Sequence, residues 1–234
     1  MSGKIASNVT KIRSFSSIPA AWTFSGSTYV ATELDQHIRG LATAWAGPGD
    51  EPWIDLDSNQ VKKIIEDQLC PVVRDTYGRL TPPPGGTVID HSVDLLLATW
   101  TRPSGGFLVR VYPDTATMVP DAPMVAMGYG HEYATVAQGL LSHHLAADPS
   151  LHEAKVLAHR TVTAVCEVSS GGVGPPVQLA TVTQTGVSIL DVDDVDAISL
   201  AVDRWKNLEQ ESLIALRDGE PAREARHDLP GTTV

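Results

Sequence analysis

The order of strand-like and helix-like apolar patterns along the chain restricts its fold more than any other feature of the sequence. Short apolar or alternating stretches typical of β-strands come in groups, and two amphipathic helical stretches separate one group from the next. Single helices between strands are typical of parallel βαβ crossovers, whereas paired helices favour antiparallel sheets covered by helical layers. The sequence therefore predicts an α+β fold with two antiparallel sheets.

The expected elements follow from these patterns and from the turn residues between them. Strands are expected twice within 4–24 around a Ser-Ser-Ile-Pro turn, at 94–100, 106–113 and 123–128, and twice within 176–190. Helices are expected at 28–45, 61–78 with a kink or restart at Pro71, 131–146, from 150 onward, and 193–216. In the last two helices the residues expected to face inward are Leu151, Ala154, Leu157, Ala158, Val162 and Val165, and Ile198, Ala201, Val202, Trp205 and Leu208.

Length and composition favour one large domain. The chain has 234 residues, of which 42% are hydrophobic, enough to bury a substantial core. We expect a single domain over residues 1–216. The remainder, 217–234, is polar and rich in Pro and Gly, and is expected to form a flexible tail.

Charge and cysteine content argue against several classes of protein. The net charge of -11, from 17 basic and 28 acidic residues, disfavours a nucleic-acid partner. The two cysteines, Cys70 and Cys166, are expected to be reduced core residues. With no apolar run long enough for a membrane span or a signal peptide, we expect a cytoplasmic protein that does not bind membranes. His143 and His144 lack carboxylates at ligand spacing, so neither a metal site nor a cofactor is expected.

Four local motifs resemble segments of the proteasome-type N-terminal nucleophile (Ntn) hydrolases. Asn-Val-Thr-Lys-Ile at 8–12 is similar to the segment that carries the active-site lysine, and residues 20–34 resemble the strand and turn that lead into the first helix. Met-Gly-Tyr-Gly-His-Glu-Tyr-Ala at 127–134 resembles a Gly-Ser-Gly turn before a helix, and Glu-Val-Ser-Ser-Gly-Gly at 167–172 an Asp-x-x-Ser-Gly-Gly run. The resemblance covers about 7–190 and implies a four-layer αββα sandwich. A different α+β sandwich with coincidental turns is the alternative.

The resemblance also implies the site residues. The catalytic positions would be Lys11, Glu167 and Ser170, and the substrate-binding positions Thr23, Gly128 and Tyr129. Lys11 and Ser170 match the family, whereas Thr23 replaces a glycine whose N–H serves the oxyanion, Tyr129 replaces a serine, and Glu167 replaces an aspartate. Without the resemblance, each would be interpreted as an ordinary surface or turn residue.

The family's nucleophile is a threonine at the mature N-terminus, whose α-amino group acts as the base. By resemblance, two strands should precede the Lys11 segment, roughly 20 residues at typical strand lengths. Here only ten residues precede Lys11, so we expect an N-terminally shortened domain. Two explanations remain open, a chain truncated at its start or a naturally short, non-catalytic relative; a nucleophilic Ser2 is disfavoured because it lies too close to Lys11.

These observations predict a proteasome-like subunit, related to threonine-type endopeptidases in protein degradation and inactive as the chain is given. The alternative is a non-catalytic ring-forming or scaffold subunit with the same fold. The resemblance implies a homo-oligomer or ring, a peptide or protein substrate if the chain is active, and possible cooperation with an ATP-dependent unfoldase. The aromatic residues within 45–53 and 77–87 are candidates for contacts between subunits.

Overall fold

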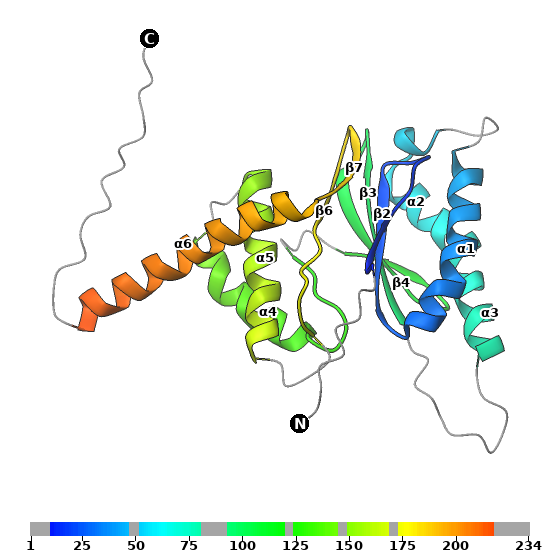
Figure 1. Cartoon of the computed structure of the whole chain (residues 1–234). Helices are drawn as coiled ribbons and strands as arrows, with labels where there is room; N and C mark the ends of the chain where they lie inside the picture. Colours follow the sequence, from blue (N-terminus) through cyan, green and yellow to red (C-terminus); the bar gives the residue numbers. More distant parts are fainter. Residues whose placement is uncertain are drawn as a thin grey trace, which may run out of the picture.

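The computed structural model describes residues 10–46, 52–80, 93–119, 124–144, 149–168 and 173–217. Within them it is a mixed α+β structure with two antiparallel sheets, as the sequence predicts. Figure 1 shows the larger sheet with helices α1–α3 on one side and with β6, β7 and helices α4–α6 on the other.

The larger sheet has five strands in the order β1-β2-β3-β4-β5. Their bounds are Ile12–Ser14, Ala20–Gly26, Val93–Thr101, Gly105–Val111 and Ala116–Met118. The hairpin of β3 and β4 confirms the prediction for 94–113, and its turn ends at Gly105, whose φ of 68° suits glycine. In β3 buried and half-buried residues alternate, because every second side chain points toward the helices α1–α3.

The second sheet is the hairpin of β6 (Ala180–Thr183) and β7 (Gly186–Ile189). It confirms the two strands predicted within 176–190. β6 packs against β3, and β7 against β1 and β2, so the hairpin covers part of the sheet face opposite α1–α3.

The first helical layer and the sheet enclose the core. Helix α1 (Thr28–Trp45) begins at the N-cap Ser27, whose side chain accepts a hydrogen bond from the N–H of Val30. The short helix η1 (Trp53–Asp55) and helix α2 (Ser58–Ile64) follow, and Asp57 and Gln60 form a capping box at the start of α2. Apolar residues of these elements are buried against β2, β3 and β4.

The helix widens to a π-helical turn just before Pro71, where the sequence predicts a kink or restart. Residues Ile65–Leu69 form a π-helical segment, η2, between α2 and α3 (Cys70–Leu80). The N–H of Cys70 bonds to the carbonyl of Ile65, five residues back. A wider turn here relieves the clash that a proline ring makes with an α-helical carbonyl.

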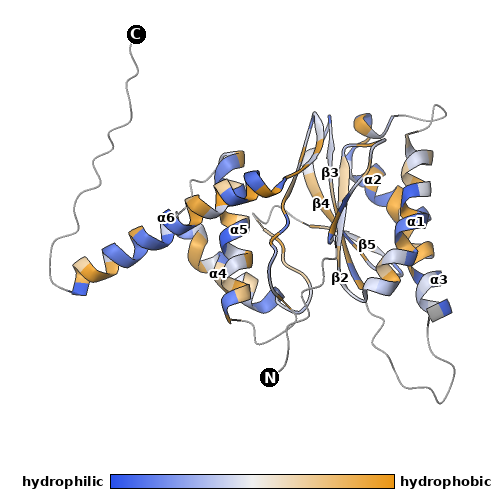
Figure 2. Ribbon diagram, in the orientation of Figure 1, coloured by the Kyte–Doolittle hydropathy of each residue, from blue (hydrophilic) through white to orange (hydrophobic). Residues whose placement is uncertain are grey.

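The second helical layer consists of α4 (His131–Leu141), the short helix η3 (Ser142–His144), α5 (Leu151–Val168) and α6 (Val192–Arg217). Of the α5 residues expected to face inward only Leu157 and Val165 are buried, and of those in α6 only Ile198 and Val202. Leu151, Val162 and Leu208 are instead exposed in the described structure. Figure 2 shows apolar and polar residues interspersed along these helices, and exposed apolar residues of α4 include Val136 and Leu140.

Two further predictions need correction. Residues 124–128 are not a strand, whereas the three-residue strand β5 was not predicted. Strand β5 pairs with β4, and Glu66 Oε1 accepts a hydrogen bond from the N–H of Ala116 in β5.

The aromatic residues proposed for subunit contacts pack internally. Trp45 and Trp53 stack with ring centroids 4.9 Å apart, and the Tyr77 hydroxyl bonds to the backbone of Val93.

Helix α6 ends at Arg217, and the rest of the expected tail lies outside the described residues. Within the ranges given above, no helix is both long and apolar enough to cross a membrane.

Candidate functional site

The corner at Gly128–Gly130 joins three parts of the fold. Gly128 has a φ of 81°, and a Cβ built on it would lie 1.9 Å from Ser25 Oγ, on β2. A Cβ on Gly130 would lie 2.6 Å from Val165 on α5 and 3.3 Å from Val173. Only glycine fits at either position, so the corner sits directly against the end of β2 and the end of α5.

Lys11 lies next to the same end of β2. Its backbone N–H donates to Gln178 Oε1 at 2.7 Å, which ties the start of β1 to the segment before β6. Its Nζ lies 4.3 Å from the centroid of the Phe24 ring, a cation–π contact. Partial burial lowers the pKa of Lys11, because desolvation disfavours the ammonium form.

Lys11 and the corner contact opposite faces of β2. Phe24, which Lys11 contacts, and Ser25, which Gly128 contacts, are consecutive residues of the strand, so their side chains point to opposite faces. The ammonium group therefore lies toward the α1 face, and the glycine corner lies on the face covered by β6 and β7.

Thr23 is half-buried in the middle of β2, two residues before Ser25 and on the same face. It lies opposite Ile12 of β1 and Leu96 of β3. In an antiparallel sheet, the backbone N–H and C=O groups of every second residue point to the same neighbouring strand. The carbonyl of Pro19 accepts a hydrogen bond from the N–H of Trp100 in β3, so the backbone N–H and C=O groups of Thr23, four residues later, also point to β3. That N–H is thus part of the sheet, not a free donor for an oxyanion.

Glu167 is held by helix α6. Its carboxylate accepts a hydrogen bond from Lys206 Nζ, and its other oxygen lies 3.9 Å from Arg160 Nη1. Tyr129 is 70% exposed, so its side chain projects from the corner instead of packing into it. Ser170 lies outside the described residues.

The structure therefore places Thr23 and Gly128 on one face of β2 and Lys11 on the other, while the charge of Glu167 is compensated by Lys206 of α6. Ser25 is a member of this neighbourhood that the sequence did not single out. The two-residue periodicity of β2 could have indicated it, because Ser25 follows Thr23 on the same face.

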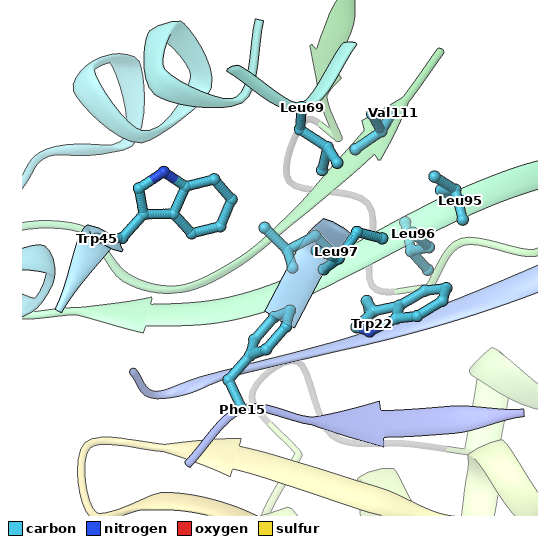
Figure 3. Close-up of a pocket in the computed structure, with 9 residues that line it drawn as sticks. Phe15, Trp22, Trp45, Leu69, Leu95, Leu96, Leu97 and Val111 are labelled. Carbon is cyan, nitrogen blue, oxygen red and sulfur yellow. The ribbon is translucent and has the colours of Figure 1, made fainter. Parts of the chain in front are cut away.

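An apolar hollow lies elsewhere, in the core. Figure 3 shows it lined by side chains from the sheet and the first helical layer, among them Phe15, Trp22, Trp45 and Leu69. No polar surface lines it, so it offers nothing to orient a substrate or move a proton. His159 is buried on α5, and nowhere in the described part of the chain do three or more His, Cys, Asp or Glu side chains gather as a metal site requires.

No protein-family model matches the chain, and no curated protein matches its sequence.

Proposed function

We propose that the chain is a proteasome-like subunit of the Ntn hydrolase class that does not hydrolyse peptides by itself. The observation that carries this proposal is the meeting of β2, the Gly128–Gly130 corner and the end of α5. These three segments hold three of the four motifs that resemble the family, and the fourth, the Lys11 segment, contacts the adjacent Phe24. The placement of helices on both sides of two antiparallel sheets supports the same kinship and the αββα plan (Figure 1).

The local chemistry supports an inactive site. A lysine that assists a nucleophile should face the place where the substrate binds, but Lys11 lies over Phe24, away from the corner. An oxyanion needs a free donor, and the N–H of Thr23 points into the sheet. The carboxylate of Glu167 is paired with the ammonium group of Lys206 and is not available to orient a catalytic group.

A covalent probe tests this proposal. The mass of the full chain is measured before and after incubation with a peptide epoxyketone that reacts with N-terminal threonines. An active proteasome serves as the positive control. We expect no mass increase of the chain and no release of fluorophore from peptide substrates. A stoichiometric adduct or peptide hydrolysis would show that the site is active and would overturn the inactive assignment.

A ring-forming or scaffold role is the second candidate, and the exposed apolar residues of the second helical layer favour it. Tyr133, Val136 and Leu140 recur at helical spacing on α4 and are all exposed. If this role applies, native mass spectrometry should detect a closed oligomer of identical subunits. Peptide substrates and an ATP-dependent unfoldase would be relevant only to an active relative of this subunit.

A further inference from the structure

Helix α6 is held to the rest of the fold mainly by one neighbour. It follows β7 after a short link, Leu190 and Asp191, and then lies across α5 (Figure 1). Among the described elements, α5 makes the main contact with it. Ile198 and Val202 of α6 are buried, whereas Leu208 and the later leucines of the helix are exposed. Helix α6 can therefore leave α5 without disturbing the five-stranded sheet or α1–α3.

A histidine is buried where the two helices meet. His159 belongs to α5, and its Nδ1 lies 3.3 Å from Thr163 Oγ1, one helical turn further along. The charged groups that act on its imidazole are Asp203, which favours the protonated form, and Lys206, which disfavours it. Both belong to α6, so the imidazole lies at the contact between α5 and α6.

Ion pairs cross the same contact. Lys206 Nζ donates to the carboxylate of Glu167, and a Glu209 oxygen lies 3.5 Å from Arg160 Nη2. Two basic and two acidic groups compensate each other here. Carboxylates, ammonium groups and guanidinium groups all keep their charge between about pH 5.5 and 7.5, whereas an imidazole titrates in this range. His159 is therefore the group of the contact whose charge changes near neutral pH.

We propose that α6 is an arm released by acid, in which protonation of His159 frees the helix from α5. In the docked state the imidazolium would be held away from water with Lys206 beside it, and Asp203 offsets only part of this cost. Once α6 has left, water solvates the charge. Proton binding therefore favours the released state, and the link at 190–191 is the hinge. The inference does not depend on the proposed function.

Linkage between proton binding and release limits the size of the effect. Burial lowers the pKa of His159 in the docked state, whereas an exposed imidazole has a pKa of about 6.5. At about pH 5.5 the protonated form of the released state is thus roughly ten times more abundant than its neutral form. The equilibrium constant for release can therefore rise by up to about tenfold between about pH 7.5 and 5.5.

Hydrogen–deuterium exchange of the full chain tests the release, with rates corrected for the intrinsic effect of pH. Amides of α6 within 196–206 should be less protected than those of α1, and their protection should fall by about threefold to tenfold between about pH 7.5 and 5.5. Urea below the unfolding transition should leave the exchange of α6 unchanged, because release of one helix exposes little surface. Equal protection of α6 and α1 would show that α6 opens only when the whole fold unfolds, and would overturn the inference.

Three variants assign the effect to His159. His159→Gln should abolish the fall in α6 protection, and His152→Gln, at an exposed position of the same helix, should keep it. Asp203→Asn removes the group that offsets the cost of protonation, so the fall by about pH 5.5 should be larger than in the wild type, within the tenfold limit. Because Asp203 is exposed, this variant keeps the test decisive even if His159→Gln does not fold. An undiminished fall in His159→Gln, or a smaller fall in Asp203→Asn than in the wild type, would overturn the inference.

Discussion

Gly128 lies directly against Ser25, so that a Cβ at position 128 would stand 1.9 Å from the serine Oγ and 2.5 Å from its Cβ. Gly128→Ala should therefore destabilise the fold by about 2–4 kcal/mol, because the new Cβ would clash with Ser25 and because alanine is strained at the positive φ of this position. Chemical denaturation measures the loss. Gly139→Ala on α4 is the control, because a Cβ there meets nothing within 4 Å and should stabilise the helix by about 0.5–1 kcal/mol. Equal stabilities for the two variants would contradict this account of the corner.

The contact between Gly130 and Val165 yields a second prediction. Gly130→Ala should cost about 1–3 kcal/mol, because its Cβ would come within 2.6 Å of Val165 Cγ1. Val165→Ala alone should also destabilise, since it removes a buried side chain. The double variant should lose less than the sum of the two losses, because alanine at 165 makes room for the new methyl group. Strict additivity in equilibrium unfolding would argue against this packing.

Two buried threonines of β3 should respond to the same substitution with opposite signs. Thr99 Oγ1 accepts a hydrogen bond from the buried indole of Trp53 at 2.9 Å, so Thr99→Val should cost about 1–3 kcal/mol by leaving that donor unpaired. Thr101 Oγ1 is buried without a hydrogen-bond partner in the described structure, so Thr101→Val should be neutral or stabilising. Thermal unfolding of the two variants separates the effects, and a larger loss for Thr101→Val would refute the assignment.

The elements that the sequence predicted well are those that local interactions define. Helices α1 and α5 begin at Ser27 and Ser150, whose side chains cap the first turn, and the capping residues are readable in the sequence. Strand β5 was missed because its three residues become a strand only by pairing with β4 and bonding to Glu66. A pairing between distant segments leaves no local pattern.

Burial in the second helical layer was overpredicted for a related reason. Periodicity shows which side of a helix is apolar, but it does not show whether another element covers that side. Leu208 was expected to face inward on α6 but is 62% exposed, although α5 contacts the neighbouring Glu209 through Arg160. In the candidate site, Gly128 was named from the resemblance of its turn to the family's Gly-Ser-Gly turn, and its role there stays a prediction, whereas the partners of Glu167 depend on how α6 returns to α5.

His159 makes stability depend on pH. It is 5% exposed on α5, and desolvation lowers the pKa of its imidazole; Lys206 adds to this effect and Asp203 opposes it. Because the folded pKa lies below the unfolded value of 6.5, the unfolded chain binds more protons as the pH falls. The contribution of His159 is therefore fully present above about pH 6.5 and is lost as the pH falls from there toward the lowered pKa.

His159→Gln should remove this part of the pH dependence, because glutamine does not titrate. Urea unfolding at about pH 7.5, 6.5 and 5.5 should give a smaller decrease in unfolding free energy for this variant than for the wild type. His152→Gln, at an exposed position of the same helix, should follow the wild type and so exclude a general effect of losing a histidine. The wild type and both variants could instead lose stability in parallel on acidification. Since His159→Gln removes the His159 imidazole, that result would show that the decrease comes from the carboxylates of the fold and not from His159.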